Sequence, residues 1–236
     1  MRMGIMQPYL FPYVGYFQLI NAVDKFVLLD DVHFIKKGWI NRNSILVNQK
    51  KFLFTIPLQK ASQNKLINEL KIISEDKWKR NLLKTITTAY RNAKCFNTVI
   101  PLLQKIILSE KEYIADMAYY SLTEISNYLS INTEIVKSST IYANRDLKAQ
   151  ARLIDICYKE TCCCYVNAIG GEKLYDRFAF AQSDIQLLFL EPRLKYYKQF
   201  KTQFIPGLSI IDLLMHNTVD ELKDMLSGYV LKEAVL

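Results

Sequence analysis

The sequence predicts an α/β fold built on a Rossmann-like, mostly parallel sheet, with a helical insertion subdomain and a small β-hairpin. Short apolar runs at residues 4–6 and 26–29 have the composition of buried strands, and apolar residues between them recur at helical spacing. Further apolar runs of strand length return after residue 130, behind a long helical region. A strand, a helix and a second strand in this order form a βαβ unit, whose crossover is right-handed.

Polar and aromatic residues follow both of the first two apolar runs. Open α/β sheets bind ligands beyond the carboxyl ends of their strands, so the residues that leave these strands are the first candidates for a site. We expect substrate contacts from Gln7, Pro8 and Tyr9, and catalytic roles for Asp30, Asp31 and His33. A carboxylate or an imidazole in this place is suited to act as a general base.

The next segment concentrates positive charge beside a large aromatic side chain. It contains Lys36, Lys37, Trp39, Arg42 and Asn43. Arginine offers a planar fork and lysine a point charge, so the segment is suited to hold a phosphate or a carboxylate. The alternative is an exposed loop in front of a hairpin over residues 44–57, because charged runs commonly face solvent.

The chain divides into three predicted regions. Residues 1–73 hold the βαβ unit, the hairpin, a strand at 66–73 and the candidate site. Residues 74–130 predict a subdomain of about three helices, with breaks near Lys94 and Ser109. Residues 131–236 complete the sheet and add closing helices, with strands predicted at 133–137, 163–168 and 185–190.

Two turns after predicted strands contain groups that can bind anions. Ser138, Ser139 and Thr140 offer hydroxyl donors, although hydroxyl-rich segments of this kind commonly just turn the chain, and we favour that interpretation. Asn167, Gly170 and Gly171 lie where a strand passes through glycines into a short helix. Glycine admits close approach of a ligand and a helix N-terminus presents free N–H groups, so we assign these three residues to substrate binding.

The C-terminal region contains two possible capping boxes. In a capping box, a hydroxyl side chain and an acidic side chain three residues later accept hydrogen bonds from backbone N–H groups at the start of a helix. The pairs are Ser209 with Asp212, and Thr218 with Glu221. His216 lies between these two predicted helices. It is a candidate acid or base, but we favour a capping role for it.

Composition limits the classes of protein and partner. The net charge of +8 favours anionic small-molecule substrates, but Lys and Arg are dispersed along the chain and no known nucleic-acid motif appears. The five cysteines lack the spacing of a zinc site, and we expect them to be reduced and mostly buried. No metal site is expected. No apolar run reaches the roughly 18 residues of a membrane span, so we expect a cytoplasmic protein.

Several separate motifs, in this order, resemble the WbqC-like proteins of bacterial surface-polysaccharide gene clusters. The motifs are Met6-Gln7-Pro8-Tyr9, Pro12-Tyr13-Val14-Gly15-Tyr16-Phe17, Asp30-Asp31-Val32, Lys37-Gly38-Trp39-Ile40-Asn41-Arg42-Asn43, Asn167-Ala168-Ile169-Gly170-Gly171 and Leu208-Ser209-Ile210-Ile211-Asp212. The resemblance covers nearly the whole chain. It adds Tyr13, Gly15 and Tyr16 to the candidate substrate-binding residues.

The resemblance also implies a function. The family is associated with O-antigen and capsule synthesis, and some members are labelled glycine or aminoacyl transferases that act on amino sugars. We therefore expect transfer of an acyl or aminoacyl group to a nucleotide-linked amino sugar. An activated donor would be the co-substrate, no cofactor would be tightly bound, and tRNA would be a partner only if the donor is aminoacyl-tRNA.

Three alternatives stay open at this point. The order of strand, Tyr13-x-Gly15-Tyr16, helix and strand resembles the HIGH-type nucleotidylyl transferases, with tyrosines where those enzymes have histidines. A glycosyltransferase would use the same anion pocket, although Asp30-Asp31 is not the Asp-x-Asp motif of the metal-dependent enzymes. A non-catalytic scaffold of an assembly complex would need only exposed aromatic side chains and positive charge.

Overall fold

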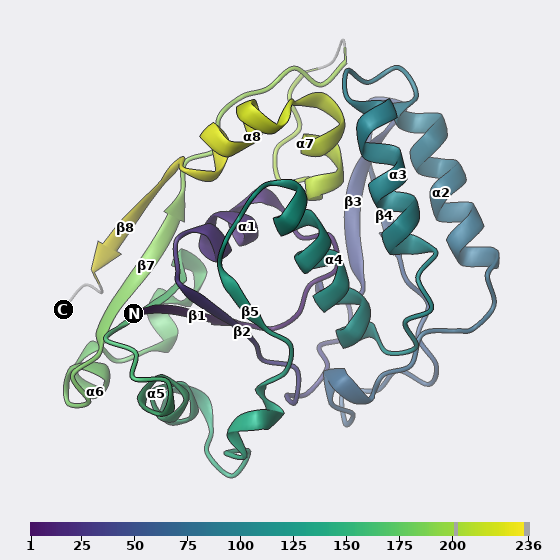
Figure 1. The fold of residues 1–236 in the computed structure, drawn as a ribbon. Coiled ribbons are helices and arrows are strands. Elements are labelled where there is room, and N and C mark those ends of the chain that lie inside the picture. Colours follow the sequence, from purple (N-terminus) through teal and green to yellow (C-terminus); the bar gives the residue numbers. More distant parts are fainter. Residues whose placement is uncertain (201–202, 234–236) are drawn as a thin grey trace.

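A six-stranded sheet forms the centre of the computed structural model, which describes residues 1–200 and 203–233 (Figure 1). The strands are β1 (Arg2–Met6), β2 (Lys25–Leu28), β5 (Glu134–Val136), β6 (Cys164–Ala168), β7 (Gln186–Pro192) and β8 (Tyr229–Glu233). Their order in the sheet is β5-β2-β1-β6-β7-β8, and every neighbouring pair is parallel except β7 with β8. This confirms an α/β fold with a mostly parallel sheet.

The order of the strands creates a switch point in the middle of the sheet. From β1 the chain moves outward to β2 and β5 and then returns to place β6 on the other side of β1. This is the order of the doubly wound dinucleotide-binding folds, in which the connections from the two central strands leave in opposite directions and open a crevice at the carboxyl edge. The ends of β1 and β6 therefore mark where a ligand is expected.

Helices cover both faces of the sheet. They are α1 (Val14–Asn21), α2 (Lys77–Tyr90), α3 (Phe96–Ile107), α4 (Ile114–Tyr128), α5 (Ala149–Lys159), α6 (Arg177–Ala181), α7 (Ile210–His216) and α8 (Val219–Leu226), with 3-10 turns η1 (Ile67–Glu69), η2 (Ser139–Tyr142) and η3 (Ile169–Leu174). One core contains Phe26, Leu28 and Val166 under α1, α4, α7 and α8, and the other contains Val27 and Tyr165 under α5 and α6. Successive side chains of a strand point to opposite faces of the sheet, so Phe26 and Leu28 belong to one core and Val27 to the other.

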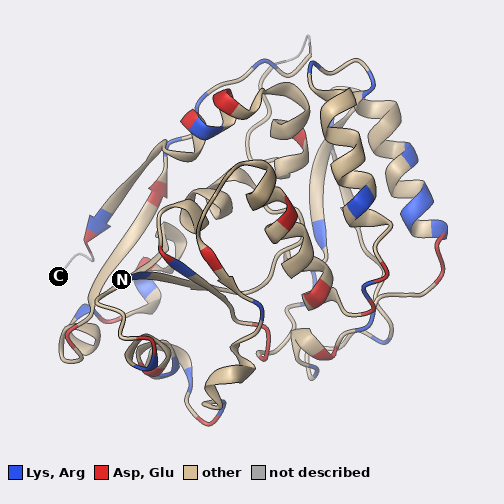
Figure 2. Cartoon of the chain, viewed as in Figure 1, with Lys and Arg blue, Asp and Glu red and all other residues tan. Residues whose placement is uncertain are grey.

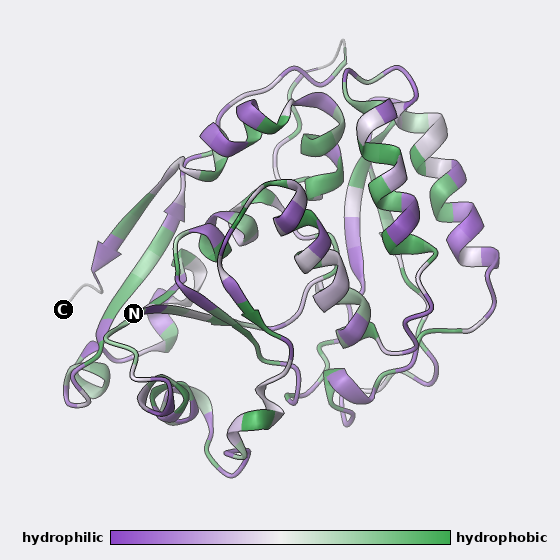
Figure 3. Ribbon diagram, viewed as in Figure 1, coloured by the Kyte–Doolittle hydropathy of each residue, from purple (hydrophilic) through white to green (hydrophobic). Residues whose placement is uncertain are grey.

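The hairpin of β3 (Arg42–Val47) and β4 (Lys50–Thr55) is separate from the main sheet. It packs against α2 and α7, and its Ile45 and Phe54 join the same core as the helices and one face of the sheet. Helices α2 and α3 carry apolar and polar residues in alternating patches along their length, as Figure 3 shows. The three helices predicted between residues 74 and 130 are confirmed, with the breaks near Lys94 and Ser109.

Charged side chains are distributed over helices and loops throughout the fold. Figure 2 shows Lys and Arg on many elements, with Asp and Glu interspersed. Several are paired, including Lys25 with Glu160 at 2.7 Å and Lys105 with Glu124 at 2.7 Å. The Lys and Arg residues are therefore not concentrated on a single element, and their distribution does not indicate a nucleic-acid-binding surface.

Two elements differ from the sequence-based expectation. The strand predicted at residues 66–73 is instead the 3-10 turn η1 flanked by isolated bridges, because the Glu69 carboxylate accepts from the Leu66 N–H at 2.9 Å and closes a local turn. The sequence does not predict strand β8. A five-residue strand at the edge of a sheet buries few side chains, so its apolar residues form only a weak alternating pattern.

A close approach between the two first strands fixes the exit of β1. Gly4 pairs in register with Phe26, and a Cβ at Gly4 would lie 2.9 Å from the Phe26 ring. The Phe26 ring in turn meets Tyr16 edge to face at 5.4 Å, and the Tyr16 hydroxyl donates to the Gln7 carbonyl oxygen at 2.8 Å. The absence of a side chain at Gly4 therefore helps to set where Gln7 leaves the sheet.

We expect Gly4→Ala to lower the free energy of unfolding by about 1–3 kcal/mol, the usual cost of overpacking a core. Urea denaturation measures the change. Gly170→Ala is the matched control, because a Cβ there would meet no atom within 4 Å. Equal stability of Gly4→Ala and the natural protein would show that Phe26 can move aside without cost.

Candidate functional site

The exit of β1 is held by buried aromatic side chains. Tyr16 is buried, and burial keeps the pKa of its hydroxyl well above the ordinary value, so that it stays protonated as the donor to the Gln7 carbonyl. The Tyr9 ring lies 5.6 Å from the Tyr16 ring, and Pro8, between Gln7 and Tyr9 in the chain, is buried. Within residues 1–200 and 203–233 the side-chain amide of Gln7 makes no hydrogen bond, and it is half-buried. That amide is available to a ligand.

Tyr13 and Gly15 form the start of α1. A Cβ at Gly15 would lie 2.3 Å from the Tyr13 ring, so glycine lets this ring rest against the helix backbone. Tyr13 lines a cavity of about 20 Å³ together with Leu208 and Tyr197, which come from the connection between β7 and α7. Its ring therefore faces the C-terminal part of the chain, and burial raises the pKa of its hydroxyl.

At the exit of β6, the Asn167 side chain is hydrogen-bonded within the protein, whereas Gly170 has free space beside it. The Asn167 amide donates to the Tyr165 hydroxyl at 2.9 Å, and its oxygen accepts from the Ala168 N–H at 2.6 Å. Gly171 packs close to Asn167, whereas Gly170 is exposed, with empty space where a Cβ would be. Asn167 is thus engaged in shaping the turn, and the backbone at Gly170 is accessible to a ligand.

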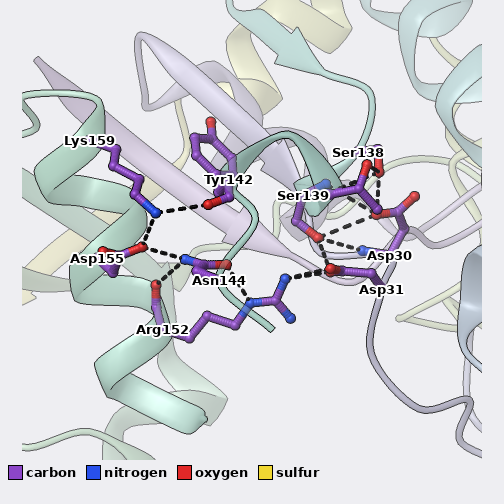
Figure 4. A network of polar contacts seen from close by, with 10 residues as sticks. Asp30, Asp31, Ser138, Ser139, Tyr142, Asn144, Arg152, Asp155 and Lys159 are labelled. Atoms are coloured by element: carbon purple, nitrogen blue, oxygen red, sulfur yellow. Dashed lines mark hydrogen bonds and ion pairs between the residues drawn. The ribbon is translucent and has the colours of Figure 1, made fainter. Parts of the chain in front are cut away.

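Asp30 and Asp31 leave β2 and meet the start of η2 in a buried network (Figure 4). Oδ1 of Asp30 accepts from the Ser138 hydroxyl at 2.8 Å and from the Ser139 N–H at 3.1 Å. The Ser139 hydroxyl donates to Asp31 and also lies 3.3 Å from Asp30. The carboxyl ends of β2 and β5 are therefore tied together by side chains.

Asp31 is committed to an ion pair. Nη2 of Arg152 on α5 lies 2.6 Å and 2.7 Å from its two oxygens, and both side chains are almost fully buried. The Arg152 Nε donates to Asn144 at 3.0 Å, and Asn144 donates to Asp155 at 2.7 Å. A carboxylate that balances a buried guanidinium cannot accept a proton without leaving that cation unpaired. This geometry suits a structural role for Asp31.

Asp30 has a different environment from its neighbour. Burial raises the pKa of its carboxyl and the nearby Asp31 adds to this, while the hydrogen bonds from Ser138 and Ser139 oppose the rise. Figure 4 shows its second oxygen, Oδ2, pointing away from the serines, and no described residue donates to it. A carboxylate with a raised pKa and an open oxygen is suited to accept a proton at neutral pH.

His33 and the two lysines of the following loop are exposed. The His33 Nδ1 lies 2.9 Å from the Gln63 carbonyl oxygen, which places a ring proton on Nδ1 and leaves Nε2 without a protein partner among the described residues. Lys36 and Lys37 extend toward solvent. The loop returns to the exit of β1, because the Ile40 carbonyl oxygen accepts from the Leu10 N–H at 3.1 Å.

Arg42 and Asn43 hold this loop in shape. The Arg42 guanidinium donates to the carbonyl of Gly38 at 2.9 Å and to that of Lys37, and it lies 5.9 Å from the centre of the exposed Trp39 ring. The buried Asn43 amide donates to the Phe11 carbonyl at 2.8 Å. Most of the fork of Arg42 is therefore engaged within the loop, and the side-chain charges that the loop presents to solvent are those of the lysines.

Sequence reasoning passed over three residues that the network depends on. The sequence pattern favours an ordinary turn for Ser138 and Ser139, and it does not point to Arg152. A signal for Arg152 exists, because it lies on the helix face that also carries Leu153 and Ile156. A charged residue on the buried face of a helix indicates a buried partner, but the pattern does not say which of the chain's acids it is.

The described parts of the chain offer no group of three or more His, Cys, Asp or Glu side chains placed to hold a metal ion. All five cysteines are free, and four of them are buried. No helix within these parts is long and apolar enough to cross a membrane.

We expect Asp31→Asn to lower the free energy of unfolding by about 3–5 kcal/mol, because the buried Arg152 cation loses its counter-ion. Chemical denaturation at neutral pH measures the change. In the matched double variant Asp31→Leu/Arg152→Met both charges are absent, and most of the loss is expected to be recovered. A single variant as stable as the natural protein would mean that Arg152 finds water or another acid.

Comparisons with known proteins agree on the family. The model of the WbqC-like protein family matches residues 7–224. "Uncharacterized protein Rv1507c" from Mycobacterium tuberculosis (strain ATCC 25618 / H37Rv) is 29% identical over 218 residues, which is 91% of this chain and 93% of that protein. No solved structure matches the chain. The family match begins where β1 ends and continues through α1, β2, the hairpin, the helical region and α7 into α8, and this chain therefore belongs to the WbqC-like protein family.

Proposed function

We propose that this protein is a transferase of surface-polysaccharide biosynthesis that moves an acyl or aminoacyl group onto the amine of a nucleotide-linked amino sugar. The observation that carries the proposal is the open Oδ2 of Asp30, a carboxyl of raised pKa at the carboxyl edge of the sheet. A carboxyl whose pKa is raised by burial, and which keeps one oxygen free of protein donors, is typical of functional sites. The family's association with polysaccharide gene clusters supports the pathway.

The reaction requires one proton acceptor. The sugar amine attacks the carbonyl carbon of the activated donor, a C–N bond forms, and the bond from that carbon to the leaving oxygen or sulfur breaks. Asp30 Oδ2 takes the proton that the amine loses and then returns it to the leaving group. Ser138 and Ser139 hold Oδ1 so that Oδ2 faces the ligand.

The anionic part of the substrate would lie along the exits of β1 and β6. Lys36 and Lys37 supply positive charge, and the free amide of Gln7 supplies a donor. The accessible backbone at Gly170 allows close approach. The position agrees with the general rule that ligands of open α/β sheets bind at the switch point between strands, here β1 and β6.

A glycosyltransferase or a nucleotidylyl transferase of the same pathway would use the same edge. The sheet order is consistent with a nucleotide ligand, but the Tyr16 hydroxyl is already engaged by the Gln7 carbonyl. A non-catalytic scaffold would have no use for an open oxygen on a buried carboxyl, which is why we favour an enzyme.

We expect a nucleotide-linked amino sugar to raise the thermal unfolding midpoint, since a ligand at about 100 times its Kd adds about 2.7 kcal/mol of stability. The panel includes acyl-CoAs, nucleoside triphosphates and aminoacyl-tRNA. Lys36→Ala/Lys37→Ala should lose most of the rise. Lys77→Ala/Lys84→Ala is the control, because it removes two exposed lysines from α2. An unchanged rise in the first variant would exclude the loop as the anion site, and silence across the panel would favour a scaffold.

Asp30→Asn tests the base. We expect turnover to fall by at least about 100-fold while the ligand still raises the unfolding midpoint, because the amide oxygen keeps its serine donors but cannot accept the proton. The raised pKa predicts a second difference. The natural protein should lose stability relative to Asp30→Asn as the pH rises from 3.8 through the folded-state pKa, since the folded state holds the proton more tightly. Full turnover in the variant would eliminate Asp30 as the base.

A further inference from the structure

A second pocket lies at the C-terminal end of α7, away from the exits of β1 and β6. The N-terminal end of this helix contacts the site region, because the Ser209 hydroxyl donates to the Phe11 carbonyl at 2.8 Å. The opposite end borders a pocket of about 480 Å³, whose lining includes Asn92, Tyr196, Lys198, Phe200, His216 and Asn217. None of the candidate residues at the strand ends lines it.

A fully buried carboxylate stands behind the pocket. Asp212 on α7 accepts from the Tyr90 hydroxyl at 2.7 Å, from the Tyr197 hydroxyl at 2.5 Å and from the Gln199 amide at 2.9 Å. Burial and the Asp212 charge both raise the pKa of Tyr90 and that of Tyr197 far above the ordinary value, so both remain donors. The carboxylate is thereby held in one position.

His216 lies between this carboxylate and the pocket. Its side chain is only 5% exposed, and its Nε2 is 3.9 Å from Asp212 Oδ1 and is buried with no hydrogen-bond partner. Phe200 packs edge to face on the ring at 4.5 Å. Burial lowers the pKa of His216, with Asp212 opposing, so the neutral ring predominates at neutral pH. A proton on Nε2 faces Asp212, and Nδ1 is then an acceptor.

Of the caps that the sequence predicts in this part of the chain, only the box of Thr218 with Glu221 forms as expected. Asn217, not His216, closes α7, because its amide donates to the Leu213 carbonyl at 2.8 Å. Ser209 accepts from the Ile211 N–H at 3.3 Å without help from Asp212, whose carboxylate points into the core. The capping box of Thr218 with Glu221 is confirmed. His216 and Asp212 therefore remain without a role in holding helix ends.

The lining of the pocket has the chemistry of a carbohydrate site. Tyr196 is 83% exposed and Phe200 is half-buried, which gives aromatic surface for the apolar C–H groups of a sugar ring. Asn92 and Lys198 are exposed and offer polar groups to hydroxyls. Glu221 also borders the pocket and pairs with Lys94 at 2.9 Å, so the rim carries both signs of charge and favours a neutral ligand over a phosphate.

We propose that this pocket binds a pyranose sugar, and that the imidazole of His216 accepts a hydrogen bond from one of its hydroxyl groups. The rings of Tyr90 and Phe200, which pack edge to face on the imidazole at 5.8 Å and 4.5 Å, keep it in the orientation that leaves an acceptor toward the pocket. The site goes beyond the proposed transferase activity, because it uses none of the residues at the strand ends and requires only binding.

Ring signals of the histidines in a labelled sample test the proposal directly, since the chain has two histidines and His33→Gln assigns them. The probes are D-glucose, D-galactose, D-mannose and N-acetyl-D-glucosamine, with inorganic phosphate as a separate arm. We expect at least one sugar to shift the His216 signal in a saturable way and to leave His33 unchanged. No shift from any sugar, or an equal shift from phosphate, would overturn the proposal.

A matched pair of tyrosine variants locates the site. Tyr196→Ala should weaken the sugar about tenfold, as the loss of an aromatic contact does. Tyr158→Ala removes a tyrosine that is 75% exposed on α5 and should leave the affinity unchanged. Both side chains are exposed, so neither change threatens folding. An unaltered affinity in Tyr196→Ala would contradict the site. Lys36→Ala/Lys37→Ala should keep the His216 shift, which separates this proposal from the transferase.

Discussion

The ion pair between Asp31 and Arg152 is the contact on which the carboxyl edge of the sheet depends. Both charges are almost fully buried, so neither can be left alone without a large cost in free energy. Arg152 comes from α5, which covers one face of the sheet, and Asp31 follows β2. Together with the Ser139 hydroxyl, the pair fixes the position of the chain that leaves β2 relative to the chain that leaves β5.

The same pair explains how two adjacent aspartates have different chemistry. Asp31 is balanced by a guanidinium, whereas Asp30 accepts only from neutral donors and has a raised pKa. Fixing Asp31 also fixes the backbone of its neighbour, so Oδ2 of Asp30 keeps one direction. A general base requires this combination of a tuned pKa and a fixed position.

The local pattern of the chain was sufficient to predict the βαβ unit, the hairpin and the helical region, because each depends on the spacing of apolar residues over a few turns. It placed Gln7, Asp30 and Asn167 at strand ends for the same reason. It could not show that Asp31 binds a residue 121 positions away, or that Tyr90 reaches Asp212 over 122. Such pairs are decided by the order of the strands and by helix packing, which periodicity does not encode. The local pattern therefore predicts a capping role for Asp212 that its carboxylate does not have.

Tyr90 joins three parts of the fold through one hydroxyl. It donates to Asp212 on α7 and accepts from the Leu46 N–H of β3 at 2.8 Å, while its ring belongs to α2. Helix α7 is also attached at its two ends. The Ile210 N–H donates to the Pro12 carbonyl at 2.9 Å, close to the start of α1, and near the C-terminal end the Met215 carbonyl accepts from the Cys95 N–H at 3.0 Å. The edge that carries Gln7 and the pocket that contains His216 are thus joined by one short helix fixed at both ends. A displacement of α7 would therefore alter the geometry of both places.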